Sequence, residues 1–461
     1  MIHPKRKQFK LLQTEARLLI PLAAPILAAQ LAQQSLAFTD TVMAGRVSAT
    51  DLAGVAVGGS IWGPLFLFLY GVFLAITPMV AQLNGAGKIS ETGPLVRRGI
   101  VVSLPLVLIT ILLLRSASFI FARMGVDPQV AAISADYLKA LSWGMPAVAI
   151  FFLLRNLSEG LGLVRPSMLI GLASIPVNVA GTYVFIYGKL GFSAMGGVGC
   201  GWASALSLWF MCGCMLLTIW RIRRYSMTYF YDLSRKCGAD GATQFIRLGL
   251  PIGFSLLVEA SIFALIALFL SPLGALTVAS HQITLNYSSM IFMIPLSISS
   301  AITIRVGNAI GKQRFDRARL VSKAGLFLNS SIALVTATLT MVFAENIAGI
   351  YTRDPQVIAI AVGLLYLNAL YQFSDAFQVG AAAALRGYKD TRVPLLMVVI
   401  AYWVIGLPLG YSLALTDIFG APMGAKGFWI SLIIGLSVAA ILLGLRLRKV
   451  GLREGSFSGA P

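Results

Sequence analysis

The sequence predicts an all-α membrane protein in which twelve transmembrane helices form two six-helix bundles, related by a pseudo-twofold axis along the membrane normal. The composition, the grouping of the apolar residues and an internal repeat all support this prediction. Hydrophobic residues make up 58% of the 461 residues and charged residues only 11%. A soluble domain carries roughly a quarter charged residues, so the composition argues against a soluble protein.

The apolar residues are grouped in long blocks that are nearly free of charge. A helical block of about 20 residues rises 1.5 Å per residue and therefore spans a hydrocarbon core of about 30 Å. The loops between the blocks are short. The expected spans are 17–41, 53–80, 99–122, 131–154, 166–187, 198–220, 246–270, 278–303, 321–343, 357–384, 393–415 and 424–445.

An internal repeat indicates two copies of one six-helix unit. Ala-Ile-Thr at 75–77 recurs at 301–303, and Asp-Pro-Gln-Val at 127–130 recurs at 354–357, both at an offset of about 226 residues. Six spans return the chain to its starting side, so both copies have the same orientation and their axis lies along the membrane normal.

The repeat divides the chain into two lobes. We expect an N-terminal six-helix lobe over 1–220, a polar and basic cytoplasmic linker over 221–245, and a C-terminal six-helix lobe over 246–461. Two bundles with a cleft between them favour transport, because rocking one bundle against the other opens the cleft to each side in turn. One two-lobe monomer is sufficient for this.

The formal net charge of +19 invites a nucleic-acid interpretation, which the positions of the charges argue against. If the N-terminus is cytoplasmic, most of the 36 Lys and Arg fall on the cytoplasmic side of alternating spans, as membrane insertion requires. We therefore expect a multi-pass protein in contact with membrane lipid, with both termini cytoplasmic and no nucleic-acid partner. The basic residues on the outer side are Arg46, Arg115, Arg123, Lys139, Lys189, Arg353 and Lys426.

The energy source for active transport is expected to be an ion gradient. The sequence contains no GxxxxGK[ST] phosphate loop, and its short loops leave no room for an ATPase domain. No cofactor is expected beyond the coupling ion, which is sodium or a proton.

Three carboxylates lie inside the expected spans: Asp40 near the end of the first, Glu259 in the middle of the seventh and Asp375 deep in the tenth. A charged carboxylate in the bilayer costs at least a few kcal/mol, so such residues face a partner or a wet cavity. Burial favours the protonated acid, whereas neighbouring oxygen atoms favour a bound cation. These residues are therefore the candidate binding sites for a proton or a sodium ion.

Other polar residues in the spans suggest a cavity. Asn178 and Thr182 share one face of the fifth expected helix, and Gln282 and Asn286 share one face of the eighth, because residues four apart are neighbours on a helix. Hydrogen bonding between helices is the alternative explanation for all four.

Several motifs resemble those of the multidrug and toxic compound extrusion (MATE) family, particularly its NorM-type bacterial branch. They are TDTVMAGR at 39–46, VAQLNGAG at 80–87, GGVGCG at 196–201 and QFSDAFQ at 372–378. The resemblance covers essentially the whole chain. It implies a secondary active exporter in the bacterial inner membrane that antiports organic cations and hydrophobic drugs against sodium ions or protons.

The resemblance also implies specific sites. The family's second-lobe cation site corresponds to Glu259 with Asp375, with Tyr371 and Asp354 nearby, and the two carboxylates are a candidate site for a sodium ion, with a proton as the alternative. The first-lobe acidic site matches Asp40 with Asn178. Thr182 stands where the branch often has a second Asn, which weakens the case for sodium there. Binding of the ion is expected to weaken the hold on a cationic drug.

Two other functions remain open from the sequence. A lipid-linked precursor flippase of the same superfamily would carry a more cationic cavity. A membrane-embedded enzyme would need a nucleophile with its base or a metal cluster, yet the sequence has neither HExxH nor GxSxG and only two histidines. We therefore expect no enzymatic activity.

Overall fold

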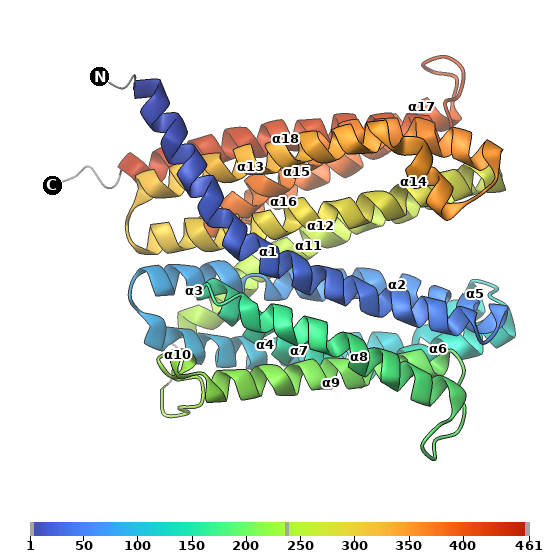
Figure 1. Ribbon diagram of the computed structural model, residues 1–461, viewed down its shortest axis with the longest axis horizontal. Helices are drawn as coiled ribbons and strands as arrows, with labels where there is room; N and C mark the ends of the chain where they lie inside the picture. The colour runs from blue at the N-terminus through green and yellow to red at the C-terminus, as the bar shows by residue number, and fades with distance from the viewer. Residues whose placement is uncertain (1–3, 236–238, 457–461) are drawn as a thin grey trace. The chain divides into compact units, whose positions relative to one another are not determined.

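The chain is predominantly helical in the parts that the computed structural model describes, residues 4–235 and 239–456 (Figure 1). No strand occurs in these ranges. By length and apolar composition, eleven helical segments in them are able to cross a membrane. A twelfth span is obtained when the bent pair Pro128–Ser142 and Met145–Gly160 is counted as one. The predicted fold class is confirmed.

The helices form two compact units, which are described one by one. The first unit is Pro25–Gly253, and the second unit is Met1–Ala24 together with Phe254–Pro461. These boundaries differ from those of the predicted lobes. The start of the chain groups with the second unit, and the first unit continues past the expected linker, whose positions 236–238 lie outside the described residues.

Two long helices contribute to both units: α1 (Pro4–Gly45) and α11 (Ala239–Leu270). The other elements of the first unit are α2 (Ala49–Phe73), α3 (Ile76–Gly85), η1 (Ile89–Glu91), α4 (Thr92–Arg115), α5 (Ala117–Arg123), α6 (Pro128–Ser142), α7 (Met145–Gly160), α8 (Arg165–Tyr187), α9 (Val198–Arg221) and α10 (Arg223–Ser226). Those of the second unit are η2 (Ser271–Leu273), α12 (Ala275–Gly311), α13 (Phe315–Val342), α14 (Ala344–Tyr351), α15 (Pro355–Gly387), α16 (Arg392–Val399), η3 (Ile400–Gly406), α17 (Leu407–Leu415) and α18 (Ala425–Ser456).

Both polar and apolar contacts connect the beginning of α1 to the second unit. Glu15 forms salt bridges with Arg305 and with Arg317, the latter at 3.1 Å. Leu19 and Ala23 are buried in the same core cluster as residues of α12, α15 and α18. Hydropathy carries no information about which helices a span packs against, so the sequence did not indicate this assignment.

The expected span 131–154 is a broken helix in the structure. It consists of α6 and α7, which meet at an angle of 50°. Pro146 at the start of α7 supplies no backbone N–H and clashes with a preceding helical turn, which is the ordinary cause of such a kink.

The repeated Asp-Pro-Gln-Val motif starts a helix in both units. The Asp127 carboxylate accepts a hydrogen bond from the backbone N–H of Gln129 at 2.9 Å, and Asp354 accepts one from Gln356 at 2.9 Å. Proline follows in both cases at the first helical position, where its missing N–H costs nothing. The motif is thus a helix N-cap.

The duplication extends to a packing contact inside each unit. In the first unit, a Cβ added to Gly160 would lie 2.7 Å from Val80 and 3.0 Å from the Thr77 carbonyl oxygen. In the second, a Cβ added to Gly387 would lie 2.7 Å from Val306 and 3.2 Å from the Thr303 carbonyl oxygen. Only glycine permits two helices to approach this closely.

The second unit has its core between long helices that lie side by side. Figure 1 shows α12, α13, α15 and α18 running together. Next to them, α16 and α17 are joined through the π-helix η3, in which each turn holds an extra residue. Such π segments often occur at functional sites because they redirect side chains.

Candidate functional site

The first unit buries Asp40 of α1 among neutral hydrogen-bond donors. Its Oδ2 accepts a hydrogen bond from the Ser204 hydroxyl at 2.6 Å. Its Oδ1 accepts bonds from Asn178 Nδ2 at 3.4 Å and from the Thr182 hydroxyl at 3.3 Å. The Asp40 side chain is only 4% exposed. The structure therefore brings Asp40, Asn178 and Thr182 together, as the sequence predicted.

Ser204 on α9 completes this group, and the sequence analysis missed it. Small hydroxyl residues are frequent in transmembrane helices, so Ser204 carried no signal by itself. The buried Oδ1 of Asn178 has no hydrogen-bond partner among the described residues. A carboxylate, an amide oxygen and two hydroxyls form a set of hard oxygen ligands suited to a small cation.

In the second unit, Glu259 of α11 is held by α15. Gln378 Nε2 donates a hydrogen bond to Glu259 Oε1 at 3.0 Å. Gln378 is buried, and its own Oε1 has no partner among the described residues. Glu259 lies within electrostatic range of Asp375, three residues before Gln378 on α15. Two carboxylates on neighbouring helices thus belong to one acidic group, as predicted.

Asp375 and Tyr371 are one turn apart on α15, and each is 6% exposed. The Tyr371 ring contacts Trp429 edge-on, with ring centroids 5.6 Å apart, and Trp429 Nε1 donates to His281 Nδ1 at 3.3 Å. Tyr371 lies within electrostatic range of Asp375 and Glu259 and is therefore part of the second-unit group.

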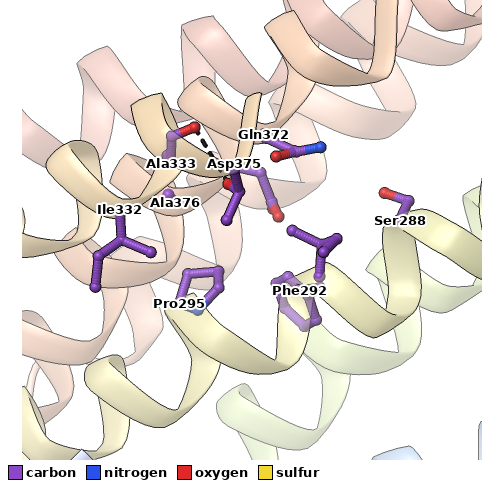
Figure 2. Close-up of a pocket in the computed structure, with 10 residues that line it drawn as sticks. Ser288, Phe292, Pro295, Ile332, Ala333, Gln372, Asp375 and Ala376 are labelled. Atoms are coloured by element: carbon purple, nitrogen blue, oxygen red, sulfur yellow. Dashed lines mark hydrogen bonds between the residues drawn. The ribbon is translucent and has the colours of Figure 1, made fainter. Parts of the chain in front are cut away.

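Asp375 opens into a small pocket between α12, α13 and α15 (Figure 2). Figure 2 shows Asp375 and Gln372 side by side, with Phe292 and Pro295 of α12 across the pocket. The residues that line the pocket combine one carboxylate with a mostly apolar wall. They are Ser288, Ile291, Phe292, Pro295, Ile332, Ala333, Thr336, Gln372, Asp375 and Ala376.

Tyr402 is a further member of the second-unit group that the sequence analysis missed. It lies in the π-helix η3, is 2% exposed and is within electrostatic range of Glu259, Tyr371 and Asp375. A π-helical turn has no simple sequence signature, because its side chains follow neither the α-helical nor the strand period.

Three predicted site residues do not join the carboxylates. Asp354 is the exposed N-cap of α15 and, at 1.5 Å per residue, lies roughly 30 Å along the helix from Asp375. The expectation that Asp354 lies near Asp375 is therefore wrong, because Asp354 is the N-cap of α15. Gln282 and Asn286 do share one face of α12, as predicted, but both side chains are exposed, away from the buried polar residues of this helix.

Firm ion pairs lie elsewhere in the described residues. In the first unit, Arg155 and Glu159 of α7 form a buried salt bridge of 2.6 Å, and Arg155 also donates to Gln33 at 3.0 Å. In the second unit, Asp390 pairs with Arg446 at 2.7 Å. The hydrogen-bond donors to the Asp40 side chain are instead neutral: Asn178, Thr182 and Ser204.

Comparison with known proteins identifies one family model and several relatives that match most of the chain. The MatE family model matches residues 25–184 and 251–412. The multidrug resistance protein NorM of Photobacterium profundum is 44% identical over 443 residues, covering 96% of this chain and 97% of the relative. The multidrug resistance protein MdtK of Yersinia pestis is 44% identical over 438 residues, covering 94% of this chain and 95% of the relative.

The fold is also similar to that of solved structures. The crystal structure of a MATE protein in the bent conformation matches with a TM-score of 0.87 and 18% identity. The match covers 98% of this chain and 99% of that one. Such a likeness extends over the complete helical arrangement.

Proposed function

The chain belongs to the MatE family of multidrug efflux transporters, and from this premise we propose that it exchanges cationic and hydrophobic drugs for sodium ions or protons by alternating access. The exchange takes place in the bacterial inner membrane, with both termini cytoplasmic, and a monomer carries it out. No enzymatic step and no cofactor other than the ion is involved.

The observation that carries this proposal is the pocket at Asp375. A carboxylate faces a mostly apolar wall there, with Glu259 in electrostatic range. A hydrophobic cation needs both an apolar surface and a negative charge, and a proton or sodium ion needs the same carboxylate oxygens. Occupation by one ligand therefore disfavours the other.

Competition of this kind produces exchange without ATP. When Asp375 and Glu259 are neutralised by the ion, the attraction for a drug cation is lost and the drug is released. When the ion leaves, the negative charge attracts the next drug cation. The free-energy coupling between the two ligands is reciprocal, so an inward ion gradient drives outward drug movement.

The Asp40 group supports a second ion-binding position. Its oxygen ligands come from three helices, α1, α8 and α9, so an ion that binds there also ties these helices together. The unpartnered Oδ1 of Asn178 is a further oxygen available to a sodium ion.

Asp375→Asn tests the proposal, with Asp354→Asn as the matched control. The first variant keeps the shape of the side chain but loses its charge, so it should insert and fold yet lose efflux of a fluorescent organic cation from proteoliposomes. The control makes the same change at an exposed cap on the same helix, where Asn caps equally well. Sodium and proton gradients are imposed separately. Normal efflux by Asp375→Asn would overturn the proposal.

A further inference from the structure

A file of buried polar side chains leads through the second unit to Asp375. Gln372, on the turn before Asp375, donates from Nε2 to the Thr340 hydroxyl at 3.0 Å and to Asn368 Oδ1 at 2.9 Å. Thr340 and Asn368 are completely buried, and Gln372 is 6% exposed. Gln372 also lines the pocket at Asp375 (Figure 2).

The file continues from Thr340 toward the surface. The Thr340 hydroxyl donates its only hydrogen to the Thr336 carbonyl at 2.7 Å, so the Tyr287 hydroxyl at 2.8 Å is the donor to Thr340. Tyr287 is partly exposed and lies within electrostatic range of Tyr351 on α14, which is 40% exposed. The sequence topology assigns this end of α13 and α15 to the outer side of the membrane.

Two buried atoms along the file have unused hydrogen-bonding capacity. Gln372 Oε1 and Asn368 Nδ2 have no partner among the described residues. An unmet buried polar atom costs about 1–3 kcal/mol, and buried water ordinarily satisfies such atoms. An acceptor and a donor on the same helix, one turn apart, suit a chain of water molecules.

The first unit has no polar counterpart of Tyr287 and Thr340, which distinguishes these residues from polar residues that serve helix packing in both units. At the offset of about 226 residues, the first-unit counterparts of Tyr287 and Thr340 are Ile61 and Leu114. Interhelical hydrogen bonds that only stabilise a bundle would be equally useful in both units. The polar file occurs in the unit that carries both Glu259 and Asp375.

We propose that Tyr287, Thr340, Asn368 and Gln372 line a water-filled path by which a proton travels between the outer solution and Asp375, apart from the route of the drug. This inference rests on the proposed exchange and specifies proton access to its second-unit site. Inward, hydronium in the outer solution gives up a proton that passes from water to water and forms an O–H bond on a carboxylate oxygen of Asp375. The reverse movement returns it.

Each hydroxyl in the file has a definite part in this transfer. Tyr287 and Gln372 both donate to the Thr340 hydroxyl, so Thr340 holds these two side chains in place along the path while the proton itself passes through water. Asn368 and Gln372 orient the water through the two unused atoms. The net change is one proton removed from the outer solution and one neutral Asp375.

The test is Thr340→Val, with Thr338→Val as its matched control. Valine keeps the shape of threonine but cannot hydrogen-bond. Thr338 lies on the same helix, and its exposed hydroxyl bonds only to the Leu334 carbonyl within that helix at 2.8 Å. In proteoliposomes with an imposed proton gradient, Thr340→Val should slow efflux of a fluorescent organic cation on the order of tenfold, comparable to the loss of one hydrogen bond.

Binding of the same cation to the detergent-solubilised protein should be unchanged in Thr340→Val, because the drug does not use the path. Thr340→Ser, which restores the hydroxyl, should restore proton-driven efflux. Full-rate efflux by Thr340→Val would overturn the inference, and so would equal slowing by Thr340→Ser or by Thr338→Val. If a sodium gradient drives efflux in the unmodified protein and a proton gradient does not, the proton path is wrong while the proposed exchange stands.

Discussion

Gln378 and Glu259 are joined by a hydrogen bond of 3.0 Å between α15 and α11. The helix that carries Asp375 thereby also holds the second carboxylate of the group. Because Gln378 is neutral, it orients the Glu259 carboxylate without cancelling its charge. Movement of either helix is then coupled to the geometry of both acidic residues.

Gln378→Leu should weaken sodium binding while leaving the protein folded. A hydrogen bond to a charged group contributes about 1.5–3 kcal/mol, so the sodium concentration for half-maximal efflux should rise roughly tenfold or more. The measurement is ion-dependent efflux of a fluorescent cation from proteoliposomes. Gln282→Leu, at an exposed position of α12, is the control and should behave like the unmodified protein. An unchanged half-maximal concentration in Gln378→Leu would contradict this role.

Ser204→Ala should impair the Asp40 group selectively. The variant removes the shortest hydrogen bond to Asp40, that of 2.6 Å, together with a hydroxyl oxygen, which should cost on the order of tenfold in sodium affinity. Ser207→Ala is the control, because the Ser207 hydroxyl is buried on the same helix but bonds only to the Ala203 carbonyl of that helix. Ion-dependent efflux measures both. The prediction fails if the two variants lose affinity equally.

Arg155→Met should destabilise the first unit. The change leaves Glu159 buried without its cation, and breaking one side of a buried ion pair typically costs about 3–5 kcal/mol. Thermal unfolding of the detergent-solubilised protein should shift to lower temperature. The double variant Arg155→Met with Glu159→Leu removes both charges and should recover most of the loss. A double variant as unstable as the single one would speak against an electrostatic cause.

Glu15→Gln should loosen the beginning of α1 from the second unit. The carboxylate pairs with both Arg305 and Arg317, so its loss should lower the free energy of unfolding by about 1–3 kcal/mol. Asp316→Asn is the control, because that exposed acid pairs with Arg319 at 3.6 Å and such surface pairs contribute little. Thermal unfolding compares the two variants. If Asp316→Asn lowered the free energy of unfolding more than Glu15→Gln does, the stabilising role of the Glu15 ion pairs would be refuted.

The sequence predicted the spans well because the length of an apolar block is tied to the thickness of the membrane. The pairing of Asp40 with Asn178 was implied by the resemblance to the MATE family, and the structure places the two side chains in hydrogen-bond contact. The resemblance implied that Asp354 lies near the carboxylates, whereas the structure makes it the N-cap of α15.

Other features had no signal in the sequence. Ser204 is one of many small polar residues in the spans, and only the packing of α9 against α1 brings it to Asp40. Tyr402 reaches the carboxylates through a π-helical segment that no simple periodicity reveals. The division of α1 between two units depends on tertiary contacts and not on hydropathy.

That division bears on how the protein is assembled during synthesis. Leu19 is synthesised long before most of the residues that it packs against, because the other members of its core lie largely between Ile298 and Leu447. The beginning of α1 is therefore incompletely packed in the bilayer until the last helices are inserted. The beginning of α1 is consequently among the last segments to reach its final packing. In a truncated chain that lacks α18, this segment should be open to cleavage by quality-control proteases.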